Sequence, residues 1–327
     1  MAASIPPLRR LGQSELMVSP VGLGCWQFSR GRGLNGRYWP NLPEAEIAGI
    51  VEASLRGGVN WFDTAEAYGA GESERALAQA LNTLGRIPGD IIIATKWRPI
   101  FRTARSIAKT IDRRLEVLAG FPIDLYQIHN PFSFSSIEKQ VESMAGLVRN
   151  RKIRYIGVSN FSAKQMRVSH RLLQNEGLQL VSNQVRYSLL DRRIEQNGIL
   201  ETARELGISI IAYSPLAQGL LSGKFHENPG LIRSRGGYRK YLSAFRPKGL
   251  ERSRPVIAAL REVAQHHNGS LAEVALSWVI HSRGETVVAI PGATRTTQAT
   301  ENAESMKIQL TKDELDYLDN VSLEHKT

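Results

Sequence analysis

The stretch Asn60-Trp-Phe-Asp63-Thr-Ala-Glu-Ala-Tyr68-Gly69 starts as a short apolar strand and stops abruptly at a carboxylate, with a tyrosine five positions further on. Three other apolar runs stop at a polar residue in the same way: Ile91 to Lys96, Asp124 to His129 and Ile156 to Ser159. Parallel strands that close into a barrel bring their carboxyl ends to one mouth, where such barrels carry their chemistry. We therefore expect Asp63, Tyr68, Lys96 and His129 to lie together at the mouth of a barrel.

Strand-like and helix-like patterns alternate along the chain on both sides of this stretch. Strands are expected at 20–26, 59–62, 91–95, 125–128, 155–158, 180–185, 209–212 and 286–290. Helices are expected at 43–55, 72–84, 102–118, 137–148, 162–174, 196–205, 254–266, 271–282, 297–305 and 312–321, and a small hairpin at 8–11 and 16–19. This alternation predicts one α/β domain over residues 1–327, a (β/α)8 TIM barrel with an N-terminal β-hairpin and extra C-terminal helices.

Composition limits the class of protein. Of the 327 residues, 42% are hydrophobic and 22% are charged, which is typical of a soluble globular protein. No apolar run approaches the roughly 18 residues that a membrane span needs, and the first residues do not resemble a signal peptide. The single cysteine, Cys25, excludes an intrachain disulfide and a multi-cysteine metal site. We expect a cytoplasmic protein that has no membrane segment and no metal site.

The net charge is +11, with 42 Lys and Arg residues against 31 Asp and Glu residues. Such a balance is compatible with nucleic acid, with an anionic cofactor or with a basic surface. A loop predicted at 223–250 contains one acid, Glu227, and seven basic residues: Lys224, Arg233, Arg235, Arg239, Lys240, Arg246 and Lys248. Nucleic-acid binding would also need exposed stacking aromatics. Aromatics are only 7% of the chain and lie mostly in predicted strands or near the mouth, so nucleic acid is disfavoured.

The four residues at the strand ends suit acid–base chemistry as a set. Taken singly, each has an ordinary explanation: a capping aspartate, a surface tyrosine, a solvated lysine and a core histidine. A phenol has a pKa near ~10 and is a poor proton donor at neutral pH unless its surroundings stabilise the phenolate. Lys96 beside Tyr68 would lower that pKa, and Asp63 would hold Lys96 charged.

At this point the motifs resemble those of the aldo-keto reductase superfamily over essentially the whole chain. Six motifs in the family's order and spacing carry the resemblance: Asp63-Thr-Ala-Glu-Ala-Tyr68-Gly69, Thr95-Lys96, Asp124-Leu-Tyr-Gln-Ile-His129, Ile156-Gly-Val-Ser-Asn-Phe161, Tyr213-Ser-Pro-Leu-Ala217, and Ile290-Pro-Gly-Ala-Thr-Arg295 with Glu301-Asn302. The segment Gly219-Leu-Leu-Ser-Gly-Lys224-Phe225 is more similar to the potassium-channel β-subunit-like and bacterial general-stress branch than to the aldose reductase branch.

The resemblance implies an NAD(P)H-dependent oxidoreductase of the alcohol dehydrogenase or carbonyl reductase type. In that reaction, hydride passes from reduced nicotinamide to an aldehyde or ketone and gives an alcohol. Negative charge grows on the carbonyl oxygen, so a donor is needed there. Tyr68 would be the general acid, and His129 would donate a hydrogen bond to the oxygen or help to relay the proton.

The same resemblance implies a set of cofactor-binding residues. Ser159, Asn160 and Gln184 would bind the nicotinamide carboxamide, and Tyr213 would stack under its ring. The full expected set is Cys25, Trp26, Asp63, Ser159, Asn160, Gln184, Tyr213, Ser214, Pro215, Leu216, Gln218, Ser222, Lys224, Arg235, Gly292, Thr294, Arg295, Gln298, Glu301 and Asn302. Cys25 is interpreted as a small buried residue and not as a redox switch.

NADPH is the expected cofactor, and NADH or dual use is the alternative. The aldose reductase branch places Lys and Arg where this chain has Gly292 and Gln298, so the clamp for the 2′-phosphate is incomplete. Arg295 and Arg235 could supply the missing charge. The basic 223–250 segment would fold over the pyrophosphate and adenosine.

The substrate is expected to be a small-molecule carbonyl compound, and Trp26, Trp97, Asn130 and Phe132 are the candidates that line its site. A second function stays open at this stage. The chain could be a cofactor-binding regulatory or scaffold subunit of the channel β-subunit type, with slow turnover, because such subunits keep the same four residues. The oligomeric state, monomer or homo-oligomer, also stays open.

Overall fold

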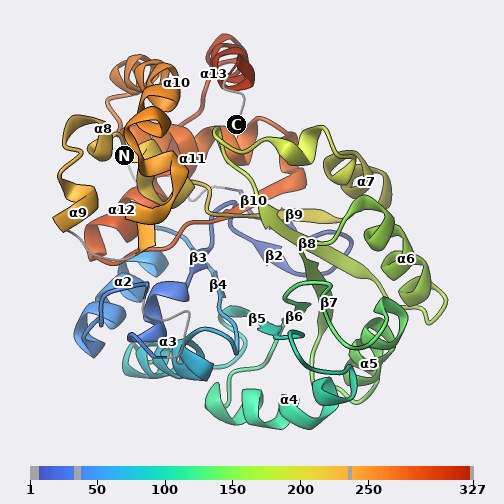
Figure 1. Ribbon diagram of the computed structural model, residues 1–327. Coiled ribbons are helices and arrows are strands. Elements are labelled where there is room, and N and C mark those ends of the chain that lie inside the picture. The colour runs from blue at the N-terminus through green and yellow to red at the C-terminus, as the bar shows by residue number, and fades with distance from the viewer. Residues whose placement is uncertain (1–6, 33–37, 235–237, 325–327) are drawn as a thin grey trace.

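The computed structural model describes residues 7–32, 38–234 and 238–324. Eight parallel strands form one sheet in the order β10-β9-β8-β7-β6-β5-β4-β3. Parallel bridges from Val21 to Ala289 and from Gly24 to Gly292 join its two edges, so the sheet curls into a nearly closed barrel (Figure 1). The strands are β3 (Leu23–Gly24), β4 (Trp61–Asp63), β5 (Ile92–Trp97), β6 (Leu125–Ile128), β7 (Tyr155–Ser159), β8 (Leu180–Arg186), β9 (Ser209–Tyr213) and β10 (Val287–Ile290).

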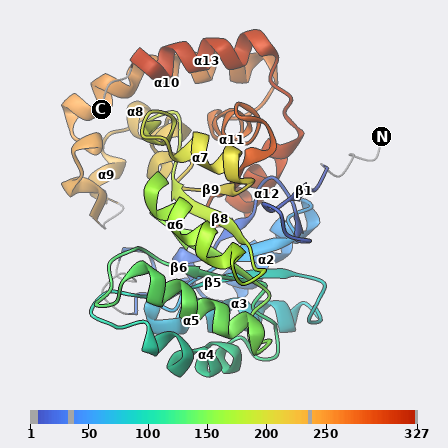
Figure 2. The same cartoon turned by 90° about the vertical axis from the view of Figure 1, so that its right-hand side faces the viewer.

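Helices follow the strands and surround the barrel, which confirms the predicted fold class. They are α2 (Glu44–Arg56), α3 (Glu72–Thr83), α4 (Arg105–Val117), α5 (Ile137–Arg149), α6 (Ala163–Gln174), α7 (Ile199–Leu206), α8 (Lys224–Glu227), α9 (Leu231–Ser234), α10 (Pro247–His266), α11 (Leu271–His281), α12 (Thr296–Glu304) and α13 (Lys312–Glu324). Capping boxes at Ser162 and Ser270 fix where α6 and α11 begin. Helices α10 and α13 pack on each other and add an outer layer (Figure 2).

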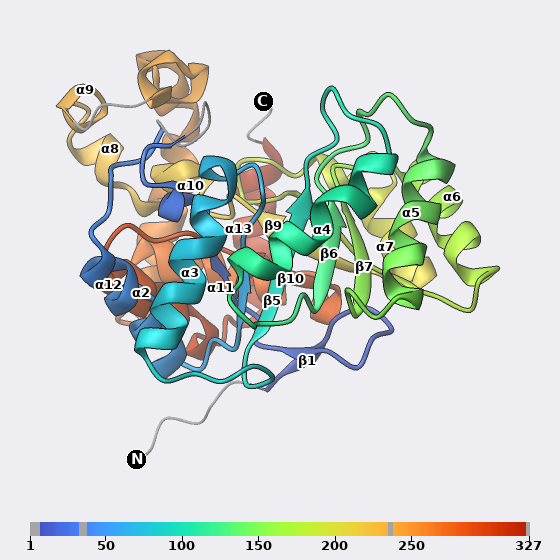
Figure 3. The ribbon, with the colours of Figure 1, turned by 90° about the horizontal axis from the view of Figure 1, so that it is seen from below.

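The N-terminal hairpin of β1 (Arg9–Arg10) and β2 (Met17–Val18) lies across one end of the barrel (Figure 3). Its apolar side chains join Trp61 and other inward residues of the strands in one buried cluster: Leu11, Leu16, Val18, Trp61, Ala94, Leu125, Val181, Ile211, Val288 and Ile290. The guanidinium of Arg9 donates to the backbone oxygens of Ile280 and Val287, the latter at 2.8 Å. The hairpin thus closes the end of the barrel at which the strands begin.

Several predicted elements differ from the structure in their bounds. The first barrel strand covers only Leu23–Gly24, because Trp26–Ser29 turn into a 3-10 helix. Helix α7 begins at Ile199 and not at Gln196, because a 3-10 turn at Arg193–Glu195 precedes it. Helix α10 begins at Pro247, well before the predicted start at Arg254.

The segment predicted as a loop over 223–250 contains short helices, α8 and α9, and the 3-10 turns Tyr238–Tyr241 and Ser243–Phe245. Its apolar residues form a small cluster together with Leu220, which precedes the segment: Leu220, Phe225, Ile232, Phe245 and Leu250. Phe225 and Phe245 meet edge to face, with ring centroids 5.2 Å apart. Because its apolar residues are few and irregularly spaced, no helical period was visible in the sequence.

Candidate functional site

A buried polar centre lies where β4 and β5 end. Lys96 and Asp63 form an ion pair with almost no solvent exposure. The ammonium of Lys96 also donates to the backbone oxygen of Thr64 at 2.8 Å and to the hydroxyl of Tyr68 at 3.4 Å. The structure therefore brings together three of the four residues that the sequence singled out.

His129, which follows the last residue of β6, completes the set. Its ring meets the Tyr68 ring edge to face, with centroids 5.6 Å apart and an interplanar angle of 81°. Burial, together with the nearby Lys96 and Arg98, lowers the pKa of His129 to about 3. His129 is thus a neutral imidazole at neutral pH.

The ionisation of Tyr68 differs from the simple expectation. Burial raises the pKa of Tyr68, and although Lys96 acts in the lowering direction, the net shift is upward. Burial lowers the pKa of Lys96, but Asp63 and Tyr68 raise it more, so its net shift is also upward. Tyr68 is therefore a protonated phenol next to a charged ammonium, which is the state a proton donor requires.

The loop that carries Tyr68 is tied down on several sides. Ser73 donates to the backbone oxygen of Cys25 at 2.6 Å and bonds Thr64 at 2.8 Å. Glu66 accepts from the Arg98 amide at 2.6 Å and forms an ion pair with Arg102. These contacts hold the loop before and after Tyr68, so the distance between its hydroxyl and Lys96 is set by the fold.

Two glutamines on other strands complete the polar centre by donating to Asp63. Gln127 of β6 and Gln184 of β8 are buried, and their side-chain amides donate to the same oxygen of Asp63 at 3.0 and 2.8 Å. Gln184 was expected near the nicotinamide, whereas Gln127 was not a predicted site residue. Its signal in the sequence is a polar residue inside the apolar run Asp124-Leu-Tyr-Gln-Ile-His129.

The residues expected at the nicotinamide form one connected group beside His129. The Tyr213 hydroxyl donates to the Asn160 side chain at 3.0 Å, and the Asn160 amide donates to the His129 backbone oxygen at 3.2 Å. Ser159 donates to the backbone oxygen of Gln184 at 2.9 Å. The ends of β6, β7, β8 and β9 are thus linked by polar side chains around the mouth.

The residues expected at the pyrophosphate and adenosine also converge. Burial raises the pKa of Glu301 on α12, and the positive charges of Arg295 and Lys224 act to lower it. Both cations are therefore near this carboxylate. After β9 the backbone takes positive φ at Ser214, Ala217, Gln218 and Gly219. Such concentrations of strained backbone are typical of ligand-binding loops.

The neighbouring residues of this group are placed as follows. Pro215 is buried, Leu216 is partly buried, and Ser222 donates to the backbone oxygen of Gly219 at 2.8 Å. The Asn302 side chain is 5% exposed, and its amide nitrogen has no hydrogen-bond partner among the described residues. A buried donor without a partner fits an adenine acceptor. The residues present therefore fit a nicotinamide dinucleotide.

Two backbone amides at the start of α12 already donate to side chains of this protein. Gln298 accepts from the Thr294 amide at 2.9 Å, and Glu46 of α2 accepts from the Thr296 amide at 3.1 Å. At Gly292 a Cβ atom would lie 2.1 Å from the Gln27 amide nitrogen. Arg235, the other expected cation, lies outside the described residues.

The four candidate substrate residues differ in placement. Trp26 is half-buried and stacks on Tyr68, with ring centroids 6.0 Å apart. Asn130 is half-buried and Phe132 is exposed. Trp97 lies in β5 and not beyond it, is fully buried, and donates to Ser106 of α4 at 3.0 Å. Because side chains alternate along a strand, Trp97 faces away from Lys96, which argues against it as a wall of the carbonyl site.

Two further aromatics that the sequence did not single out border the mouth. Tyr38 and Trp39 meet Trp26 edge to face, at centroid distances of 5.9 and 5.5 Å. They come from the irregular segment before α2, where the sequence has no helical or strand period from which their positions could be predicted. Cys25 is fully buried, and burial raises the pKa of its thiol well above the usual value. It is a small core residue, as expected, and its thiol does not reach the mouth surface.

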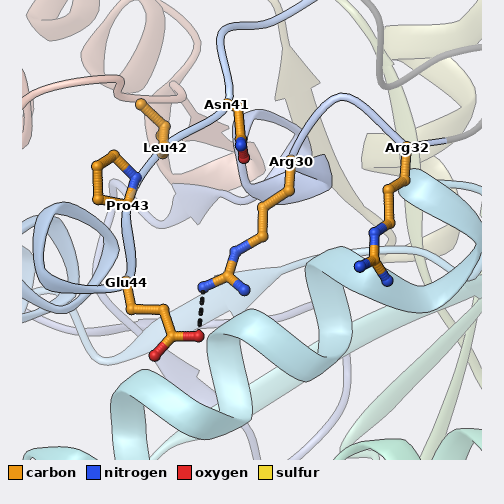
Figure 4. Close-up of a pocket in the computed structure, with 6 residues that line it drawn as sticks. All are labelled: Arg30, Arg32, Asn41, Leu42, Pro43 and Glu44. Carbon is orange, nitrogen blue, oxygen red and sulfur yellow. Dashed lines mark ion pairs between the residues drawn. The ribbon is translucent and has the colours of Figure 1, made fainter.

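A separate cavity of about 290 Å³ lies between the segment after Trp26 and the start of α2. Its lining includes Arg30, Arg32, Asn41 and Glu44, and Arg30 pairs with Glu44 at 3.2 Å (Figure 4). None of the four candidate catalytic residues lines it. Within the described ranges no helix is long and apolar enough to cross a membrane, and no three His, Cys, Asp or Glu side chains are grouped as a metal site.

Comparison with known proteins shows which sequences and structures this chain is similar to. An aldo-keto reductase of Strobilurus tenacellus is 31% identical over 313 residues, which covers 94% of this chain and 90% of the relative. A glycerol dehydrogenase of Gluconobacter oxydans has a similar structure, with a TM-score of 0.82, 26% identity, and coverage of 99% of this chain and 97% of the other.

An aldo/keto reductase of Klebsiella pneumoniae, solved in complex with NADP and acetate, matches with a TM-score of 0.72 and 25% identity over 97% of this chain and 95% of the other. The family model of the aldo/keto reductase family matches residues 20–323. The branch within the family stays a prediction. The chain is a member of the aldo/keto reductase family.

Proposed function

We propose that this chain reduces aldehydes and ketones to alcohols with NADPH, and that Tyr68 is the general acid. The observation that carries the proposal is the contact of 3.4 Å between the Lys96 ammonium and the Tyr68 hydroxyl, next to the ring of His129. The dinucleotide supplies the hydride when it is bound. The residues of the chain then have to stabilise and protonate the oxygen of the substrate.

Tyr68 suits this role because its environment favours the protonated phenol before reaction. As negative charge grows on the substrate oxygen, the phenol proton can move to it, and Lys96 stabilises the phenolate that is left. Asp63 keeps Lys96 charged in a buried site where an isolated ammonium would lose its proton. His129 is neutral, so it can donate a hydrogen bond to the oxygen without adding a second positive charge.

The cofactor would lie between two groups of residues. Ser159, Asn160, Gln184 and Tyr213 would hold the nicotinamide end. Lys224 and Arg295 would meet the phosphates, with Glu301 and Asn302 at the adenine. Among the described residues the proposed preference for NADPH depends on Arg295, because the amides of Thr294 and Thr296 already have acceptors within the chain.

The test is binding followed by turnover. Purified protein is titrated with NADPH and with NADH while tryptophan fluorescence is followed, since Trp26 borders the site. A panel of aldehydes and ketones is then added, and cofactor oxidation is recorded. We expect NADPH to bind more tightly than NADH and to be oxidised only when a carbonyl compound is present.

The variant Tyr68→Phe decides the role of the phenol. It keeps the ring and its stacking on Trp26 but removes the proton, so turnover should fall by about 10²-fold to 10⁴-fold while NADPH still binds. Unchanged turnover in Tyr68→Phe rejects Tyr68 as the acid. Tight NADPH binding without turnover on any carbonyl would instead favour the regulatory-subunit function.

A further inference from the structure

Gln127 has no assigned role, yet it lies at the centre of the barrel interior. It is in the middle of β6 with no solvent exposure. Its amide nitrogen is 3.0 Å from the Oδ2 atom of Asp63. Its amide oxygen accepts from the Gln184 amide at 3.2 Å, and the same Gln184 nitrogen is 2.8 Å from Asp63 Oδ2. Asp63, Gln127 and Gln184 thus form a closed triangle of hydrogen bonds.

The chemistry of these groups fixes their orientation. An ionised carboxylate only accepts hydrogen bonds, so both amides must turn their NH2 groups towards Asp63. The oxygen of Gln127 is then left to accept the second hydrogen of Gln184. Asp63 divides its two oxygens, with Oδ2 held by the two amides and Oδ1 held by Lys96. The direction of the carboxylate is therefore set by three strands at once.

The position of Lys96 depends on that direction. Its ammonium has three hydrogens, and its partners are Asp63, the backbone oxygen of Thr64 and the hydroxyl of Tyr68. The contact with Tyr68 is the longest of the three, at 3.4 Å. A small rotation of Asp63 would move the ammonium and change this contact first.

The fold also leaves room for the Gln127 side chain. Gly157, in the neighbouring strand β7, has no side chain at the point where the stem of Gln127 passes. A Cβ atom there would lie 3.0 Å from Cγ of Gln127 and 2.5 Å from Oγ of Ser182. The first contact is tight and the second is too short to exist, so a methyl group at residue 157 would shift Ser182 and crowd the stem of Gln127 without removing any polar group.

We propose that Gln127 is a positioning residue, which together with Gln184 holds Asp63 so that Lys96 points its ammonium at the hydroxyl of Tyr68. The proposal extends the proposed function and rests on it for its meaning in catalysis. Its physical content, the placement of Lys96 against Tyr68, can be measured without turnover.

The experiment compares Gln127→Leu with the parent protein. Leucine has a similar volume but neither donor nor acceptor, so Asp63 loses one partner and Gln184 loses its acceptor. When Lys96 moves away, Tyr68 loses part of the charge that favours its phenolate, and its pKa rises. The ultraviolet absorption of tyrosinate is titrated in each protein and in its Tyr68→Phe counterpart, and the difference gives the titration of Tyr68 alone.

We expect Tyr68 to titrate at higher pH in Gln127→Leu than in the parent. The alkaline limb of kcat should move in the same direction, and kcat should fall about tenfold, a fraction of what a general acid contributes. NADPH affinity, followed by fluorescence, should change much less than kcat. Gln127→Asn keeps a shorter amide and should restore part of both effects.

Two other variants make the result specific. Ser182→Ala changes a buried polar residue that has no hydrogen bond to Asp63, and it should leave the titration of Tyr68 where it is. Gly157→Ala should shift the titration upward like Gln127→Leu, and it replaces that variant if Gln127→Leu does not fold. An unchanged Tyr68 titration in Gln127→Leu or in Gly157→Ala, or an equal shift in Ser182→Ala, overturns the proposal.

Failure of the proposed function has a different signature. If the parent does not oxidise NADPH with any carbonyl compound of the panel, the reductase assignment fails, but the tyrosinate titration still decides the role of Gln127. If the parent is active and Gln127→Leu loses activity without any shift in the Tyr68 titration, the glutamine is merely structural and the positioning role is rejected.

Discussion

Strand β5 has a buried ion pair on each of its faces. On the inner face, Lys96 meets Asp63 in the barrel, and on the outer face Thr95 donates to Glu74 of α3, which pairs with Arg114 of α4. All four charged side chains are buried. The two pairs start from adjacent residues of one strand, yet their surroundings differ.

The inner pair is fully hydrogen-bonded and reaches the mouth, since Asp63 has three donors and Lys96 touches Tyr68. The outer pair is sealed between the strand and two helices. There the Nε atom of Arg114 and the hydroxyl of Tyr126 have no partner among the described residues. Buried charge is therefore not by itself a sign of function. Contact with a titratable group at an open mouth is the distinguishing feature.

Breaking the inner pair should have the largest effect on activity. In Lys96→Met the phenolate of Tyr68 loses its stabilising charge, and kcat should fall about 10³-fold. Asp63 keeps the amides of Gln127 and Gln184 as partners, so the loss of stability should be smaller than at the outer pair. Steady-state kinetics and urea unfolding measure the two quantities. If kcat stays within a few-fold of the parent, Lys96 has no part in the chemistry.

Breaking the outer pair should have the opposite pattern. Arg114→Met leaves Glu74 buried with only Thr95 as partner, which should lower the free energy of unfolding by about 3–5 kcal/mol at a pH where Glu74 is ionised. The remaining folded protein should keep its kcat, because Arg114 does not reach the mouth. Urea unfolding and activity per folded molecule test this. A loss of kcat as large as in Lys96→Met would show that the two faces of β5 are coupled.

The inner pair could be predicted from the sequence, because each of its members ends an apolar run and parallel strands end at one mouth. The alternation of patterns gave the eight strands for the same reason. Trp97 was misplaced because β5 continues beyond Lys96, and one extra residue turns a side chain to the other face.

The outer pair could not be predicted, because Glu74 and Arg114 are brought together only by the packing of α3 against α4. A weak signal exists, since Arg114 falls on the apolar side of its helix with Ile107 and Ile111. Gln127 was overlooked for a related reason. Its partners, Asp63 and Gln184, are distant in sequence, and their meeting depends on the register of β4, β6 and β8 inside the barrel.

The outer pair should also give stability a pH dependence. Burial raises the pKa of Glu74 from its ordinary 4.5 to about 7, despite Arg114 and Thr95, which act to lower it. Between these values the folded protein keeps a proton that the unfolded chain has lost. This contribution to stability is complete below about pH 4.5 and is lost as the pH rises through about 7. Unfolding measured from pH 5 to pH 8 should show the slope, and Glu74→Gln should remove it. An identical slope in both proteins would contradict the assignment.

The smallest effect expected is on His129, and it measures how far the charge of the inner pair extends. The pKa of His129 is about 3, lowered first by burial and then by Lys96 and Arg98. This value lies below the pKa of a histidine in the unfolded chain, so the effect of His129 on stability has the opposite pH dependence to that of Glu74. Its contribution to stability is present above about pH 6.5 and is lost as the pH falls towards 3.

In Lys96→Met the imidazole of His129 loses a buried positive neighbour, so its pKa should rise by about one unit, or ~1.4 kcal/mol. Histidine NMR titration, assigned with His129→Gln, follows this change. Arg98→Met is the matched control, because Arg98 is exposed and water screens its charge, so its shift should be smaller. Equal shifts in the two variants would mean that burial does not strengthen the field of the inner pair, and the contrast between the faces of β5 would then depend on hydrogen bonding alone.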